Sequence, residues 1–278
     1  MLQNAQGDAL RGTLASAMSR LARAVPSLAA QVVDKSGLDC IKDRLGDDNA
    51  RVQQGFLNLL NTALQHPSHR LLKAIEDMEL LLHPLMRLLE CSCATVRAKV
   101  LVSLQLLFGL NRTYLLLACD KKLLGSIDRL NRDHDQDPYL SSCLSCTLTS
   151  LHTLVPAISH DIAAELAKTA SAKKPLPPGA DLKPLKHPLS LLPVLLHVLS
   201  SPCSRGAFNA ATLGAVAGYL QGIDSLSFQG SVEFRRVLLL LVEAASQHPS
   251  IVIANHQVVI SSLIPSLVHA ATADPDPG

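Results

Sequence analysis

The chain has 278 residues, of which 48% are hydrophobic and only 17% charged, so it can bury a sizeable core in one large domain or two ordinary ones. A net charge of +2 and 3% aromatic residues without tryptophan argue against nucleic acid and anionic membrane surfaces as partners. No continuous apolar run reaches the roughly 18 residues that cross a bilayer, and seven cysteines in a long chain are typical of reduced thiols in a soluble cytoplasmic protein.

Apolar residues recur at helical spacing along the whole chain, which predicts an all-α protein without strands. The first predicted helices are Ala9–Ala24, Pro26–Val33, Leu38–Leu45 and Asp48–Gln65. An apolar helix through Leu81–Leu89 and a second one from Thr95 to Leu107 follow them. Later helices are predicted at Tyr114–Cys119, Lys121–Leu130, Tyr139–Leu154, Asp161–Thr169 and Phe208–Gln221.

The apolar face of the helix Asp48–Gln65 recurs twice in register, with Asp48, Ser92 and Gly230 as the predicted N-caps. Matching positions are all apolar: Val52, Phe56, Leu57, Leu60 and Ala63, then Val96, Val100, Leu101, Leu104 and Leu107, then Phe234, Leu238, Leu239, Val242 and Ala245. Their partner helices share an apolar pair beside a proline, at Pro84, Pro193 and Pro265. Two helices in a period of about 40–47 residues indicate a HEAT/armadillo-like α-solenoid of stacked antiparallel helix pairs.

One break in composition divides this array. The segment 171–186 carries four prolines and a glycine, and we expect it to be a Pro/Lys-rich loop or linker between an N-terminal block of repeats, 1–170, and a C-terminal block, 187–278. The alternative is an ordinary long loop between two helices of one array. The last repeat lacks its second helix, which favours a truncated chain.

The chain contains no recognisable catalytic motif, so we expect neither enzyme activity nor a cofactor. Cys143 and Cys146 form a C-x-x-C motif inside a predicted helix, but no second ligand pair for zinc follows, and buried free thiols are the simpler interpretation. Carboxylates alternate from Asp133 to Asp137, yet Pro138 and Leu144 replace the glycine and glutamate of a calcium loop. A solvated turn is the simpler interpretation there, and no metal site is expected.

Five basic residues lie near the starts of the recurring helices: Arg51, Arg97, Lys99, Arg235 and Arg236. In an array stacked in register they would form a positive ladder along the concave face, suited to an acidic tail or helix of a protein partner. The alternative is that these side chains bond to neighbouring turns or stay solvated.

The stretches from Val96 to Leu101, Asn111 to Leu117, Tyr139 to Leu144 and Leu191 to His197 resemble the C-terminal helical repeats of the Unc-51-like kinase four / Runkel family. The resemblance implies an all-helical scaffold that, in the family, follows a kinase or pseudokinase domain and is associated with microtubules or cilia. The chain itself lacks the kinase motifs. We therefore expect a non-catalytic scaffold at cytoskeletal or ciliary structures. The alternatives are a targeting part of an active serine/threonine kinase, or an unrelated HEAT adaptor.

Overall fold

A computed structural model describes residues 7–75, 79–133, 137–171, 188–201, 205–221 and 231–273. Within these ranges every regular element is a helix, which confirms the predicted all-α, HEAT/armadillo-like class. None of these helices combines the length and the apolar character that a bilayer crossing requires. The chain forms two compact units, Met1–Ser150 and Leu151–Gly278.

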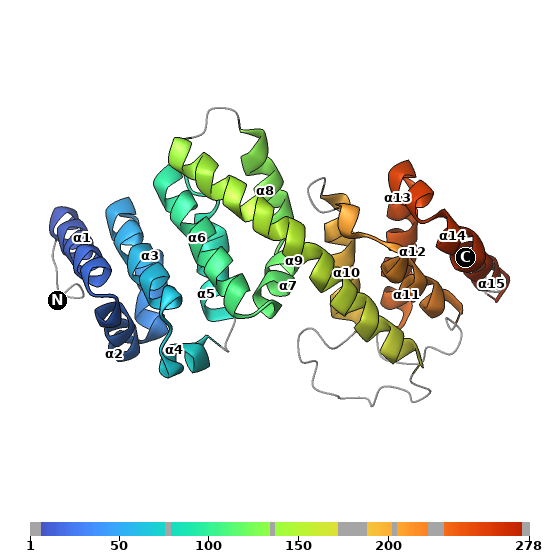
Figure 1. Ribbon diagram of the computed structural model, residues 1–278, viewed down its shortest axis with the longest axis horizontal. Helices are drawn as coiled ribbons and strands as arrows, with labels where there is room; N and C mark the ends of the chain where they lie inside the picture. Colours follow the sequence, from blue (N-terminus) through green and yellow to red (C-terminus); the bar gives the residue numbers. More distant parts are fainter. Residues whose placement is uncertain are drawn as a thin grey trace. The chain divides into compact units, whose positions relative to one another are not determined.

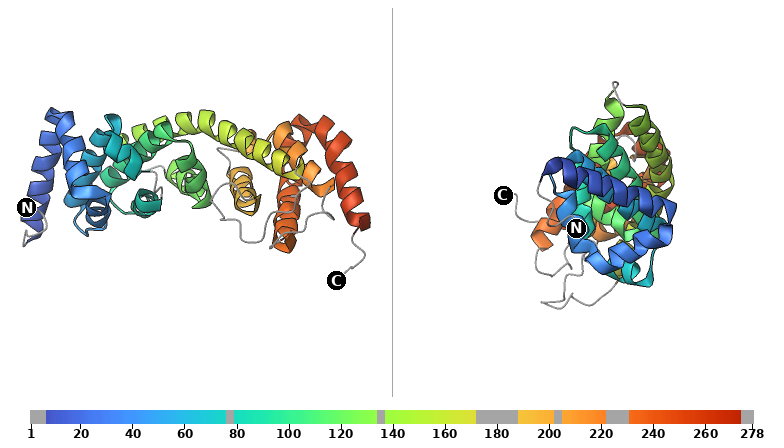
Figure 2. Two further views of the ribbon diagram at one scale, coloured as in Figure 1. Left: turned by 90° about the horizontal axis from the view of Figure 1, so that it is seen from below. Right: turned by 90° about the vertical axis from the view of Figure 1, so that its left-hand side faces the viewer.

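Unit 1 consists of two rows of packed helices. In one row α1, α3 and α6 lie side by side, and in the other α2 packs on α5, which packs on α7 (Figure 1). Figure 2 shows the helices from two further sides. The helices are α1 (Asp8–Ala24), α2 (Pro26–Leu45), α3 (Ala50–Gln65), α4 (His69–Ala74), α5 (Glu79–Leu88), α6 (Ala94–Leu110), α7 (Thr113–Asp120), α8 (Leu123–Arg132) and the first part of α9 (Pro138–Ser171).

The recurring apolar face is the core of this unit. All five predicted positions in α3 and all five in α6 are buried, with at most 3% of each side chain exposed. The two helices pack directly against each other, so they are successive copies of one element. Their N-caps lie one residue later than predicted. Asn49 caps α3 by accepting a hydrogen bond from the Arg51 N–H at 2.9 Å, and Cys93 precedes α6 without a side-chain cap.

Two predicted breaks between helices lie inside a single helix of the structure. The predicted gap between Val33 and Leu38 is a kink in α2 at Gly37, where φ is 77°. A left-handed backbone angle of this kind favours glycine because other residues would clash. The predicted break after Leu154 was wrong, since α9 continues through Pro156. Val155 and Ile158, both almost fully buried, extend its apolar stripe across that point, and their packing outweighs the lost backbone hydrogen bond.

Unit 2 begins with the second part of α9, which continues to Ser171. There α10 packs against α12, and α11 packs against η4 and α15. The elements are α10 (Pro188–Ser200), the 3₁₀ turn η2 (Arg205–Ala207), α11 (Ala210–Gln221), α12 (Ser231–Ser246), α13 (Pro249–Ala254), α14 (His256–Val258), the π-helical η4 (Val259–Leu263) and α15 (Ile264–Ala273).

The third copy of the recurring face lies on α12 and is only partly buried. Leu238, Val242 and Ala245 are buried, but Leu239 is 47% exposed, so its predicted place in the core was wrong. The side chain of Phe234 lies outside the described residues. Nearly all of the predicted segment 171–186 also lies outside them, so the division into blocks 1–170 and 187–278 stays a prediction, as does an incomplete last repeat.

Candidate docking groove

The groove begins with an unusually close contact between two helices of unit 1. Gly55 of α3 lies against Ala15 of α1, and a Cβ atom added at Gly55 would be 2.7 Å from the Ala15 Cβ. Gly12 of α1 similarly lies close to Arg51 of α3, because a Cβ added there would be 3.2 Å from the Arg51 Cβ. Small residues on both helices therefore let the two backbones approach, and the longer side chains around them form the walls of a groove.

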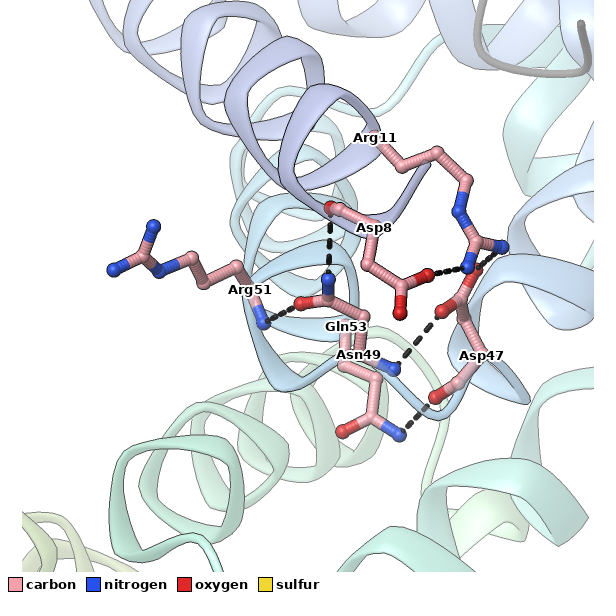
Figure 3. Close-up of polar contacts among 6 residues, drawn as sticks. All are labelled: Asp8, Arg11, Asp47, Asn49, Arg51 and Gln53. Atoms are coloured by element: carbon pink, nitrogen blue, oxygen red, sulfur yellow. Dashed lines mark hydrogen bonds and ion pairs between the residues drawn. The ribbon is translucent and has the colours of Figure 1, made fainter. Parts of the chain in front are cut away.

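A polar cluster ties α1 to the start of α3 at one end of the groove (Figure 3). The Arg11 guanidinium forms ion pairs with Asp8 of its own helix and with Asp47. The Asn49 side-chain amide donates a hydrogen bond to the Asp8 backbone carbonyl at 2.9 Å, and the Gln53 amide donates one to the Asp47 carbonyl at 2.6 Å. These bonds hold the first turns of the two helices together, and the two carboxylates raise the pKa of Arg11.

Arg51 takes no part in this cluster with its side chain. Its backbone N–H donates a hydrogen bond to the side chain of Asn49, the N-cap of α3. Its guanidinium points away from Asp8, Arg11 and Asp47 (Figure 3). The side chain reaches into the groove between α1 and α3 instead.

The groove encloses about 400 Å³ and its lining is strongly cationic and polar. Three arginines line it, Arg20 and Arg23 from α1 and Arg51 from α3, and all three are exposed to solvent. The other lining groups are three hydroxyl side chains of α1, the carboxamides of Gln54 and Asn58, and the two glycines of the helix contact. Among the residues that the structure describes, no carboxylate lines this groove, so the arrangement suits an anionic ligand.

Lys99 of α6 lies behind the groove and is engaged in the packing of the array. Its ammonium group donates a hydrogen bond to the Asn58 Oδ1, and the Asn58 amide donates to the Ser19 hydroxyl at 2.8 Å. The ammonium also lies 6.0 Å from the centre of the Tyr139 ring. Burial, followed by repulsion from Arg23, lowers the pKa of Lys99. Lys99 therefore links α1, α3, α6 and α9 and adds positive potential behind the groove.

Arg97 lies elsewhere, although it is only two positions from Lys99 in the sequence. It lines a smaller hollow of about 270 Å³ together with Glu90, Arg129 and Asp133. Glu90 and Arg129 form an ion pair there, so the charges in that hollow are mixed. The Nε of Arg97 is buried and has no hydrogen-bond partner among the described residues.

The five predicted ladder residues are thus placed differently. In unit 1, Arg51 faces the groove, Lys99 supports it and Arg97 lines another hollow. In unit 2, Arg236 is exposed on α12, and the side chain of Arg235 lies outside the described residues. A role of the five in binding a partner stays a prediction. The sequence analysis did not predict Arg20 and Arg23 as site residues. The signal that could have found them is the presence of small residues near them on α1, such as Gly12 and Ala15, because small residues permit a close contact between helices.

The C-x-x-C motif and the aspartate-rich segment do not form a metal site among the described residues. Cys143 is buried as expected, but Cys146 is exposed, so the expectation of two buried thiols in the C-x-x-C motif was wrong for Cys146. Burial is the main cause that raises the pKa of Cys143. Part of the segment from Asp133 to Asp137 lies outside the described residues. Across the ranges that the structure covers, no group of three or more His, Cys, Asp or Glu side chains could hold a metal ion.

Comparisons with known proteins agree with this architecture. Residues 154–275 match the family model for HEAT repeats of ULK4-like serine/threonine-protein kinases. The chain is 28% identical over 269 residues to the serine/threonine-protein kinase RUNKEL of Arabidopsis thaliana, covering 94% of this chain and 20% of that protein. It is also 28% identical over 280 residues to the serine/threonine-protein kinase ULK4 of Mus musculus, covering 94% and 21%. The chain spans about a fifth of the length of these curated relatives.

Proposed function

This chain belongs to the HEAT-repeat region of the ULK4/Runkel family, and on that premise we propose that it is a non-catalytic scaffold that binds protein partners. The groove between α1 and α3 is the observation that carries this proposal. It offers three solvent-exposed arginines on a rigid helix pair, and its polar lining can pair with the groups of a partner. The chain would contribute this rigid surface, and the interfaces between its helices would supply its stability.

An affinity experiment tests the scaffold role. The 278-residue chain is immobilised and incubated with cell extract, and the retained proteins are identified by mass spectrometry. We expect a reproducible set of proteins that free chain in solution competes away. An unrelated HEAT array of similar length and net charge is the control. If a chain shown to be folded by circular dichroism retains nothing beyond this control, the scaffold proposal fails.

The finer part of the proposal is an association with microtubule-based structures such as cilia. Its support is the family resemblance of the stretches around Val96–Leu101 and Asn111–Leu117, together with the overall match to the two relatives. Co-sedimentation of the chain with purified microtubules is the direct test. We expect the folded chain to pellet with microtubules and to remain in the supernatant without them. A folded chain that never pellets would remove direct binding to the microtubule lattice.

A second candidate function is favoured by the names of the relatives, both of which are serine/threonine-protein kinases. In that case the repeats would place an active catalytic domain on its substrates. Substrate phosphorylation by a full-length protein containing this chain can be compared with phosphorylation by the same protein without it. Loss of phosphorylation with preserved activity on a short peptide would support targeting, whereas no phosphorylation by either protein would leave the scaffold role alone.

A further inference from the structure

Within the described part of the chain, the arginines of the α1–α3 groove differ from the nearby Arg11 in having no acidic partner. Arg11 is neutralised by Asp8 and Asp47 at the end of the same helix pair. No ion pair or side-chain hydrogen bond is present for Arg20, Arg23 or Arg51 among the described residues, and all three are exposed.

Several cations therefore share one side of the helix pair without compensation. Arg23 is close enough to Lys99 that its charge lowers the pKa of the lysine, as a neighbouring cation does. Lys99 is itself held in place by its hydrogen bond to Asn58, a residue that lines the groove. Like charges gathered in this way raise the local positive potential and favour an anionic ligand.

The fixed geometry of the groove also favours binding. The contact of Gly55 with Ala15 and that of Gly12 with Arg51 fix the spacing of the two walls. Arginines carried by two packed helices lose less conformational freedom on binding than arginines on a loop, and each can pair with a carboxylate through two parallel hydrogen bonds. The volume of about 400 Å³ lies within the range of ligand sites and has room for a few side chains of an extended peptide.

From these observations we infer that the α1–α3 groove is a docking site for an acidic peptide segment of a protein partner, whose Asp and Glu carboxylates pair with Arg20, Arg23 and Arg51. The inference rests on the proposed scaffold function and names the surface and the chemistry of the partner. Within the lining, the Ser16 hydroxyl and the Gln54 carboxamide oxygen would form hydrogen bonds with the peptide backbone. Because the arginines are exposed, the interaction should be fast and strongly dependent on salt.

Fluorescence anisotropy with a labelled oligoglutamate peptide tests the site. The length-matched controls are an oligoglutamine peptide and an oligoglutamine peptide that carries a single phosphoserine. The native chain should bind oligoglutamate, more weakly at higher salt, and should not bind oligoglutamine. Preference for the phosphoserine peptide over oligoglutamate would overturn the assignment to carboxylates.

A pair of matched variants locates the binding. The groove variant carries Arg20→Glu and Arg51→Glu. The control variant carries Arg70→Glu and Lys73→Glu, two exposed cations of α4 that do not line the groove, so both variants change the net charge equally. We expect the groove variant to bind oligoglutamate at least about tenfold more weakly, which corresponds to the loss of one charge-assisted pair, and the control variant to bind as the native chain does. Equal losses in both would mean that only net charge matters and would overturn the site.

Two further measurements make this result interpretable. Circular dichroism and thermal unfolding show whether the groove variant is folded, and Arg20→Gln with Arg51→Gln gives a milder version if it is not. The capture experiment is then repeated with the groove variant. Loss of oligoglutamate binding with the captured proteins retained would leave the scaffold role intact and overturn this groove as its docking site. Loss of both in a folded variant supports both proposals.

Discussion

Gly55 of α3 lies directly against Ala15 of α1. A Cβ atom at Gly55 would lie 2.7 Å from the Ala15 Cβ and 2.8 Å from both the backbone carbon and the oxygen of Ala15. Cβ atoms essentially never come within 3.0 Å of such neighbouring atoms, so this contact exists only because position 55 has no side chain. Arg51 and Asn58 lie one helical turn to either side of Gly55, and the contact therefore sets the distance of both side chains from α1.

Replacing Gly55 by alanine should destabilise the chain. The added methyl group must push apart two backbones, which costs about 1–3 kcal/mol, and the better helix propensity of alanine recovers only up to about 1 kcal/mol. Urea denaturation followed by circular dichroism measures the change. The control is Gly109→Ala in α6, where nothing lies within 4 Å of the added Cβ, and there we expect no loss of stability. Equal effects of the two substitutions would contradict the close contact.

The Tyr114 hydroxyl gives a second prediction for unit 1. Tyr114 of α7 is buried, and its hydroxyl donates a hydrogen bond to the backbone carbonyl of Ile75, directly after α4. Tyr114→Phe keeps the ring but leaves that carbonyl without this donor, which should cost about 1–2 kcal/mol. Thermal or urea unfolding is the measurement. Tyr139→Phe is the matched control, because Tyr139 is 47% exposed and loss of its hydroxyl should change the free energy of unfolding by less than about 0.5 kcal/mol.

Much of unit 1 could be predicted from the sequence because its repeats obey a single spacing. Phe56 and Val100 occupy matching positions of α3 and α6, and both are buried as the apolar pattern predicts. Leu239 shows the limit of the same reasoning. Its position in the pattern matches that of Leu57, yet it is exposed, because burial depends on which neighbouring helix covers that side of α12.

The groove could not be predicted in the same way. Two of its three cations, Arg20 and Arg23, come from α1, a helix without the recurring pattern. Their grouping with Arg51 depends on a contact between residues 40 positions apart in the sequence, Ala15 and Gly55. Arg97 and Lys99 show a related limit. They lie two positions apart in the sequence, and a separation of two positions on a helix turns their side chains toward different surroundings.

The C-x-x-C motif of α9 predicts a difference in chemical reactivity between its thiols. The thiolate is the reactive form, and burial raises the pKa of the buried Cys143 above its ordinary value, whereas Cys146 is exposed. Iodoacetamide at mildly alkaline pH should therefore modify Cys146 well before Cys143. Mass spectrometry of peptides taken at successive times gives the two rates, and the variant Cys143→Ser should leave the rate at Cys146 nearly unchanged. Equal rates in the native chain would show that Cys143 is accessible.

Lys99 should make the stability of the chain depend on pH in the alkaline range. Burial and the charge of Arg23 lower its pKa in the folded chain below the ordinary 10.5. The protonated lysine is then disfavoured by folding, so the free energy of unfolding should rise with pH between the lowered pKa and about 10.5. Urea denaturation at a series of pH values should show this rise for the native chain relative to Lys99→Gln. In the variant Arg23→Gln the rise should be smaller, because one of its two causes is gone. A difference between the native chain and Lys99→Gln that stays constant with pH would mean that the Lys99 ammonium is neither desolvated nor repelled by Arg23.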